Sequence, residues 1–303
     1  MATDSIIILF YKYISIENPE KLKEEQKLLC QKLGLKGRMI IAKEGVNATF
    51  EGTSQAIHTY LEDLLSRPGF EDIHIKKSVG TGNAFPRLSI KVREEIVATH
   101  LQEKDIDPRK TTGKYLTAQE LREWFQSGKE FYIVDMRNDF EQAVGFFKNS
   151  LPSGMGFFRD LPKVLKNIEH LKNKTILTVC TGGVRCEKAS GFLVENGFSD
   201  VYQLFGGIVT YMETYPGEDF LGSLYVFDNR LVMGFNMDDP KRTIVGKCVV
   251  CGNPSEHFIN CKDGFCHRHF IVCEDCLGGA ESILCPMGCR DYSQEHPEAV
   301  AAR

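Results

Sequence analysis

The 303-residue sequence has no uninterrupted apolar run near the ~18 residues that a membrane span requires, and its mean hydropathy is -0.23. Its first residues, MATDSIIILF, lack the basic segment and the small-residue cleavage site of a secretory signal peptide. Neither charge dominates, since 37 Lys and Arg stand against 41 Asp and Glu, a net charge of -4. These absences exclude a membrane protein and a generally basic nucleic-acid coat, while a local basic face stays open. We expect a cytoplasmic protein.

Cysteine is scarce before residue 248, where only Cys30, Cys180 and Cys186 occur, and dense after it. Inside cells thiols stay reduced, so clustered cysteines there indicate metal binding before disulfides. Two C-x-x-C pairs supply four thiolates, enough for one tetrahedral, structural zinc ion. These pairs are Cys248 with Cys251 and Cys273 with Cys276.

A second metal site is expected from the remaining cysteines of the tail. It would use Cys261, Cys285 and Cys289, with either Cys266 or His269 as the fourth ligand. A segment with so few large apolar groups gains much of its fold from bound metal. Reduced thiols or adventitious disulfides are the alternative interpretation.

Residues 1–98 show the β-α-β-β-α-β order that is typical of a ferredoxin-like, α+β domain. Asn18 caps the first helix with Pro19 at its first position, and Ser54 is expected to cap the second. Glu44 and Asn47 are expected to form a turn. The predicted strands cover residues 5–13, 38–42, 48–51, 73–76 and 88–92.

Residues 99–116 have the mixed charge and the Pro and Gly content of a linker. Thr117 and Glu120 then form a capping box, and strands alternate with helices over residues 117–220. This alternation predicts an α/β domain with a largely parallel sheet. The cysteine-rich segment follows over residues 221–303.

One loop of this α/β domain carries the residues of a reactive site. Cys180 ends an apolar strand, where ligand sites of open α/β sheets lie. Two glycines let backbone N–H groups converge there, and the positive end of the next helix faces the same point. A nucleophilic or persulfide-carrying Cys180 is therefore expected, with Arg185 as its electrostatic partner. The anion cradle would be Thr181, Gly182, Gly183, Val184 and Lys188.

Each cysteine of this loop also has a purely structural interpretation. Cys180 can be a buried, inert residue at a strand end, because free cysteine is often buried. Cys186 is expected either to resolve an oxidised Cys180 through a disulfide or simply to pack under the start of the helix.

A set of basic residues lies on or beside the predicted strands of the first domain, near Tyr11, Tyr13, Phe50 and Phe85. Basic groups contact phosphates and aromatic rings stack on unpaired bases, as single-stranded RNA loops require. We expect an RNA-binding face; a solvated charged surface is the alternative. The basic residues are Arg38, Lys43, Lys76, Lys77, Arg87, Lys91 and Arg93.

Four segments between residues 117 and 217 resemble a rhodanese domain. They are Asp135-Met136-Arg137, Gly145–Ser150, the loop after Cys180 and Leu204–Ile208. The rhodanese nucleophile maps onto Cys180. The histidine of the usual Gly-His-Ile motif is replaced by Phe146. The C-x4-R loop is one residue shorter than that of tyrosine phosphatases, which favours a persulfide sulfur over a phosphate.

Three further segments resemble the bacterial tRNA uridine hydroxylase family, whose members are rhodanese-like, over essentially the whole chain. They are residues 41–49, 93–97 and 180–188. The resemblance implies oxygen-dependent 5-hydroxylation of the wobble uridine, uridine 34, in the anticodon loop of tRNA, giving 5-hydroxyuridine. Molecular oxygen is then a co-substrate, and an electron donor is required that the sequence does not identify.

The sequence carries no 2-His-1-carboxylate triad, dinucleotide fingerprint or haem motif, so no organic cofactor is evident. Three functions stay open from the residues. The first is the tRNA uridine hydroxylase, the second a sulfurtransferase that passes sulfur from a Cys180 persulfide, and the third a non-enzymatic RNA- or protein-binding scaffold. The tRNA species and the oligomeric state do not follow from the sequence.

Overall fold

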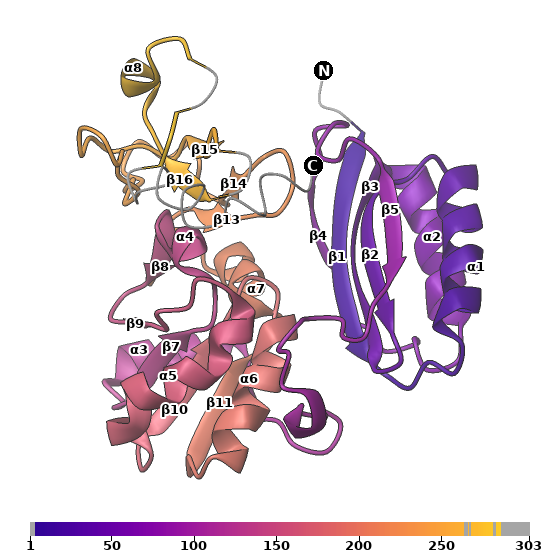
Figure 1. Cartoon of the computed structure of the whole chain (residues 1–303), viewed down its shortest axis with the longest axis horizontal. Helices are drawn as coiled ribbons and strands as arrows, with labels where there is room; N and C mark the ends of the chain where they lie inside the picture. Colours follow the sequence, from indigo (N-terminus) through magenta and orange to yellow (C-terminus); the bar gives the residue numbers. More distant parts are fainter. Residues whose placement is uncertain (1–3, 264–265, 267, 281–282, 286–303) are drawn as a thin grey trace, which may run out of the picture.

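The computed structural model describes residues 4–263, 266, 268–280 and 283–285 (Figure 1). It shows a sheet with two helices on its outer side, a separate α/β unit and a small C-terminal part above that unit. The predicted fold class, an α+β first domain and a central parallel-sheet domain followed by a cysteine-rich tail, is confirmed.

The first domain has the strand order β4-β1-β3-β2-β5. Its first four positions are those of a ferredoxin-like sheet, with neighbouring strands antiparallel, and β5 adds a parallel edge beside β2. Thr53 rather than Ser54 caps α2, since its hydroxyl accepts the Ala56 N–H. The elements are β1 (Ser5–Tyr13), α1 (Pro19–Lys32), β2 (Lys36–Ala42), β3 (Gly45–Thr53), α2 (Ser54–Ser66), β4 (Lys76–Val79) and β5 (Leu88–Val92).

Two local predictions in this domain are wrong. The strand expected over 73–76 lies at Lys76–Val79, and the turn expected through Asn47 is already β3 from Gly45 onward. The reason is tertiary: β3 pairs with β1 along its whole length, beginning with Gly45 opposite Tyr13. Gly45 has φ +151°, and a Cβ there would lie 2.0 Å from the Lys12 carbonyl oxygen, so only glycine allows this pairing.

The alternation of β1 assigns its side chains to two faces of the sheet. Ile8 and Phe10 point to the helices and pack in a core with Tyr60. Leu9 and Tyr11 point to the opposite face, which no helix of this domain covers and which faces the central domain (Figure 1). One face of the sheet thus provides stability and the other is available to the site.

The central domain is a parallel sheet in the order β6-β11-β10-β7-β9. β6 falls inside the expected linker 99–116, whose last residues therefore belong to the sheet. The elements are β6 (Lys114–Leu116), α3 (Ala118–Ser127), β7 (Tyr132–Asp135), α4 (Asp139–Gln142), β8 (Gly145–Phe147), β9 (Leu151–Pro152), α5 (Leu161–Ile168), β10 (Thr175–Val179), α6 (Val184–Glu195), β11 (Asp200–Leu204) and α7 (Gly207–Thr214).

The C-terminal part returns to short strands. β12 (Phe220–Gly222) pairs with β8 and so joins this part to the central domain. Among the helices of the described residues, none has the length and apolarity needed to cross a bilayer. The remaining elements are β13 (Leu224–Tyr225), β14 (Val232–Met233), β15 (Phe258–Asn260), β16 (His269–Ile271) and α8 (Glu274–Leu277).

A buried ion cluster joins the first two domains. The fully buried Lys188 ammonium of α6 lies 2.9 Å from Glu44, 3.0 Å from Glu95 and 2.6 Å from Asp105. Glu44 precedes β3, and the other two carboxylates belong to the connection between the domains. Removing one member of such a buried cluster leaves the other charges uncompensated, which lowers the stability of the fold by about 3–5 kcal/mol. The cluster therefore fixes the helix that follows Cys180 against the first domain.

Candidate active site

A cavity of about 1510 Å³ lies where the three parts of the chain meet. The helix-free face of the first sheet, the Cys180 loop and the segment from Leu224 to Met233 all line it. Small-molecule sites typically measure about 300–1,000 Å³, so this cavity has room for a larger ligand. Cys180 is fully buried in this structure and borders the cavity.

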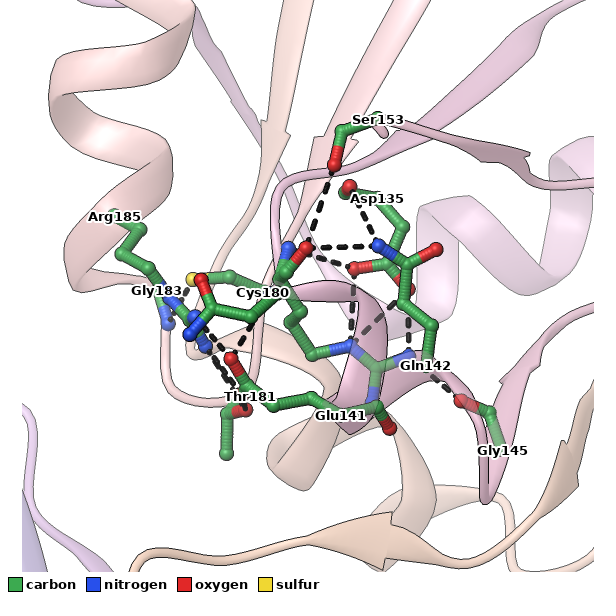
Figure 2. A network of polar contacts seen from close by, with 11 residues as sticks. Asp135, Glu141, Gln142, Gly145, Ser153, Cys180, Thr181, Gly183 and Arg185 are labelled. Atoms are coloured by element: carbon green, nitrogen blue, oxygen red, sulfur yellow. Dashed lines mark hydrogen bonds and ion pairs between the residues drawn. The ribbon is translucent and has the colours of Figure 1, made fainter. Parts of the chain in front are cut away.

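The Cys180 loop curls around its own sulfur. The Gly183 N–H donates to Cys180 Sγ at 3.2 Å, and Gly183 has φ +99°, in the left-handed region (Figure 2). The loop also lies directly on β1. A Cβ on Gly182 would lie 2.8 Å from Leu9 Cδ2, and one on Gly183 would lie 2.8 Å from Tyr11 Oη. The first domain therefore closes over the loop, and a side chain at either glycine would displace Leu9 or Tyr11.

The surroundings of Cys180 favour its thiolate. Burial opposes ionisation, but the Cys186 thiol donates to the sulfur, the Arg185 charge is near, and the N–H groups of Cys186 and Arg185 point at it. Together they lower the pKa of Cys180 to about 6. Burial and the neighbouring Cys180 raise the pKa of Cys186, which therefore stays a neutral donor. At pH 7 most of the Cys180 population is ionised.

Arg185 contributes to this field, but its hydrogen bonds go elsewhere. Its guanidinium donates to the two Glu141 carboxylate oxygens at 2.5 and 2.8 Å, and to the Thr181 hydroxyl at 3.3 Å (Figure 2). Burial would raise the pKa of Glu141, but the charges of Arg185 and Arg137 outweigh it and lower that pKa. Glu141 thus offsets most of the Arg185 charge. The sequence analysis missed it, although Glu141 three residues after Asn138 is a helix-start pattern; the Asn138 N–H donates to the Glu141 carboxylate at 3.0 Å.

The Asp135-Met136-Arg137 segment is hydrogen-bonded to the strand that leads into the Cys180 loop. Arg137 is fully buried, donates to both Asp135 oxygens at 2.6 to 3.1 Å, and donates to the Gly145 carbonyl at 2.7 Å. The Met136 N–H donates to the Val179 carbonyl at 2.8 Å, which holds the residue before Cys180. This ion pair is structural and is not in contact with the cavity.

The structure separates the expected anion cradle into two groups. Thr181, Gly182 and Val184 line the cavity with Cys180, and Gly183 donates to its sulfur. Lys188 does not belong to the cradle. Its ammonium is buried and bound to the carboxylates of Glu44, Glu95 and Asp105, because α6 packs against the domain connection.

Of the seven basic residues expected to bind RNA, six line the cavity. Arg87 instead lies with Lys91 in a separate groove of about 370 Å³ beside α1. The six are Arg38, Lys43, Lys76, Lys77, Lys91 and Arg93.

Phe50 was expected to be an aromatic partner for RNA. That prediction is wrong, because Phe50 is fully buried in the core on the helix side of the sheet. Phe85 lines the cavity with Arg38 over its ring at 5.7 Å. Sequence analysis missed Phe227, which is 45% exposed in the cavity and lies 5.9 Å from the Arg185 guanidinium. No local pattern marked it, since the C-terminal segment meets the cavity only in the folded chain.

The tail cysteines gather into two clusters. The Sγ atoms of Cys248, Cys251, Cys273 and Cys276 lie within 4.8 Å of one another, as do those of Cys261, Cys266 and Cys285. The first cluster is the pairing of the two C-x-x-C motifs expected from their spacing. In the second, Cys266 rather than His269 is the partner, because the His269 Nδ1 is 2.9 Å from the Tyr225 hydroxyl. Cys289 lies outside the described residues. Both clusters have the thiolate chemistry of a metal site.

Comparison with known proteins assigns the chain to a family. A protein from Cytophaga hutchinsonii named tRNA uridine(34) hydroxylase is 42% identical over 97% of this chain and 92% of its own length. One of the same name from Bacillus licheniformis is 41% identical over 89% and 83%. The chain belongs to the tRNA uridine(34) hydroxylase family. A solved rhodanese-like domain protein from Staphylococcus aureus is 30% identical over 32% of this chain and 90% of its own, with a TM-score of 0.28.

The domain families match the three parts of the chain in order. An acylphosphatase-like domain, UPF0176, matches residues 5–96, a rhodanese-like domain matches 117–214, and a rhodanese C-terminal family matches 221–290. The rhodanese resemblance expected from the Cys180 loop is thus confirmed. Phe146, in place of the usual histidine, lies on β8 and is 36% exposed, so the fold does not depend on an imidazole there.

The lowered pKa of Cys180 predicts its reactivity. Alkylation of its peptide by iodoacetamide, followed by mass spectrometry against pH, is expected to rise with a midpoint of about 6. An ordinary thiol has a pKa of about 8.5, so its alkylation would still be slow at pH 7. Cys30, whose pKa burial raises to about 12, is the internal control and is expected to react slowly throughout. A Cys180 midpoint above 8 would contradict the ionised site.

Proposed function

We propose that this protein hydroxylates C5 of the wobble uridine, uridine 34, of tRNA in an oxygen-dependent reaction that gives 5-hydroxyuridine. The observation that carries the proposal is the ionised Cys180 at a large cavity lined by basic and aromatic side chains. Membership of the tRNA uridine(34) hydroxylase family supports the same substrate. The cytoplasm is the compartment that offers both tRNA and reduced thiols.

The cavity fits an unstacked nucleotide with its neighbours. A base must leave its stack to reach an enclosed reactive group. Phe227, which is 45% exposed, offers a face for stacking, which contributes about 1–3 kcal/mol per base in single-strand complexes. The six lining basic residues provide contacts for the flanking phosphates. Arg87 and Lys91, in the adjoining groove, extend this basic surface beyond the cavity.

The Cys180 thiolate supplies the chemistry of activation. It adds to C6 of the uracil ring, and the C5–C6 π electrons move to C5 and O4 as an enolate. The nucleophilic C5 then takes one oxygen atom from a peroxide. Loss of the C5 proton to solvent and departure of the thiolate from C6 restore the double bond and the enzyme.

The oxygen balance requires a reductant. Molecular oxygen, two electrons and two protons give the peroxide; one oxygen atom enters C5 and the other leaves as water. The two electrons come from a two-electron donor outside this chain. Cys180 is regenerated in each turnover and is not itself the reductant.

We further propose that the tail binds structural zinc. The four-cysteine cluster offers a complete tetrahedral thiolate set, and such a set leaves no open position for catalysis. The three-cysteine cluster lacks one ligand among the described residues, and Cys289 is the candidate for it. Zinc there would hold the small segment that carries β15 and β16.

Nucleoside mass spectrometry tests the function. The full-length protein is incubated with oxygen and with tRNA from a strain that lacks the protein. NADH with a flavin serves as the reductant. The expected product is uridine plus one oxygen at position 34, absent without oxygen and absent in Cys180→Ser. Gain of one sulfur atom would instead establish the sulfurtransferase. Unchanged nucleosides, together with normally modified tRNA in the deletion strain, would leave the non-enzymatic scaffold as the remaining function.

Exchange of the C5 hydrogen tests the role of Cys180 separately from oxygen. In deuterated water without oxygen, thiolate addition and reversal are expected to place deuterium at C5 of uridine 34. Cys180→Ser is expected to lower the exchange rate by at least about 100-fold, since the activated nucleophile is lost. Cys30→Ser, in the first domain's core, serves as the matched cysteine control. Exchange that persists in Cys180→Ser would remove this residue from the addition step.

Metal analysis tests the tail. The purified protein is expected to carry zinc, and Cys276→Ser is expected to lose one equivalent and to unfold at a lower temperature, because a three-thiolate set binds zinc more weakly. Cys30→Ser is expected to retain the full zinc content. Wild-type protein that contains no zinc, with thiols that all react with Ellman's reagent in the native state, would contradict the assignment.

A further inference from the structure

Lys76 is a buried lysine without the partners that buried charges usually have. Its residue is 5% exposed. Within the described part of the chain its ammonium makes no hydrogen bond and no ion pair, and its one polar contact is with the Tyr11 ring, 4.9 Å from Nζ to the centroid. An unpaired buried charge costs several kcal/mol, so a protein retains one only where it has a use.

The strand register places Lys76 beside the Cys180 loop. On β4 it pairs with Leu9 of β1, and paired residues of antiparallel strands project from the same face of a sheet. Leu9 is the residue against which Gly182 of the loop packs. Lys76 and Cys180 both line the cavity, so the ammonium faces the space that a ligand of Cys180 would occupy.

The other charged groups near Cys180 are already compensated. Arg185 of α6 donates through both terminal nitrogens of its guanidinium to Glu141 of α4. Glu187 of α6 accepts hydrogen bonds from Tyr11 at 2.9 Å and from Tyr115 at 3.0 Å. Cys186 is a neutral donor. Among the described residues that line the cavity, Lys76 is therefore a buried cation whose charge no carboxylate within hydrogen-bonding distance offsets.

Lys76 nonetheless stays charged near neutrality. Burial lowers its pKa to about 8, and the charges of Cys180 and Glu187 act in the opposite direction. Its electrostatic partners are thus the reactive sulfur and a carboxylate that two tyrosines already hold.

We propose that Lys76 is a further catalytic residue, whose ammonium stabilises the Cys180 thiolate at rest and then the uracil enolate that thiolate addition creates. The role rests on the function proposed above. In the addition step the negative charge moves from sulfur to O4 of the base. A cation that is not held by a carboxylate interacts with both, and in a site closed to bulk water it needs no solvent reorganisation to do so. Arg185 is fixed on Glu141 and cannot follow the charge in this way.

Three variants separate this role from folding and from general charge. Lys76→Met keeps the length of the side chain and removes the charge, and we expect it to unfold at or above the wild-type temperature because a desolvated charge is gone. Lys76→Arg keeps the charge. Lys32→Met is the control for general charge, since Lys32 is an exposed lysine at the end of α1 and does not line the cavity.

The first measurement is alkylation of Cys180 against pH in the full-length protein without RNA. Lys76→Met is expected to raise the midpoint, because the charge of Lys76 interacts with that of the Cys180 thiolate. Lys76→Arg is expected to retain most of the wild-type midpoint, and Lys32→Met all of it. The second measurement is anaerobic C5 deuterium exchange at saturating tRNA, which Lys76→Met is expected to slow by about 100-fold, as the loss of an oxyanion donor does.

An unchanged alkylation midpoint with an exchange rate within two-fold of wild type in a folded Lys76→Met protein would overturn the proposal. An equal midpoint shift in Lys32→Met would also overturn it, since the effect would then be one of general charge. If wild-type protein shows no exchange and no hydroxylation while the midpoint still shifts in Lys76→Met alone, the proposed reaction fails and the pairing of Lys76 with the thiolate stands.

Discussion

A negative charge on a sulfur atom that bulk water does not reach is the constraint on which the arrangement of this protein depends. Such an ion is stable only if the groups around it replace water. Here backbone N–H groups of the loop, the Cys186 thiol and the Arg185 charge do so. Leu9 and Tyr11 then close over Gly182 and Gly183, which keeps the local dielectric low and strengthens each of these interactions. The reactive site is thus made by two domains together.

The buried charges around this sulfur fall into two kinds. Arg137 with Asp135, Arg185 with Glu141, and Lys188 with its three carboxylates are compensated, and each fixes one element against another. Lys76 has only an aromatic face and faces the cavity. The compensated charges hold the geometry of the loop, whereas an uncompensated one is available to respond when charge moves during a reaction.

The same reasoning applies to the RNA substrate proposed above, which needs more than a rhodanese-like loop offers. A rhodanese domain by itself offers a small anion site at the end of one strand. Here the ferredoxin-like sheet adds a basic wall, and the segment after β12 adds Phe227. The resulting cavity is large enough for a base with its flanking phosphates, while the sulfur stays at its enclosed part. The tail follows directly: Phe258 of β15 and Ile271 of β16 pack with Tyr225, and Cys248 packs with Ile259 and Val272.

Much of this architecture can be predicted from local sequence patterns. The apolar run along 5–13, the cap at Asn18, the capping box at Thr117 and the position of Cys180 after an apolar strand each depend on residues close to one another in the sequence. For that reason the fold class, the place of Cys180 at a strand end and the C-x-x-C pairing could be predicted. The family resemblance added the substrate, which no local pattern contains.

What the sequence could not determine are the contacts between residues far apart in the chain. Glu141 as the partner of Arg185, Lys188 among carboxylates 83 to 144 residues away, and Lys76 beside the Cys180 loop have no local signal. Which lysine is neutralised and which faces the cavity is decided by strand register and domain packing. Composition and spacing identified the charged residues; only the tertiary structure decided which of those charges are compensated, because compensation depends on distance in space and not along the chain.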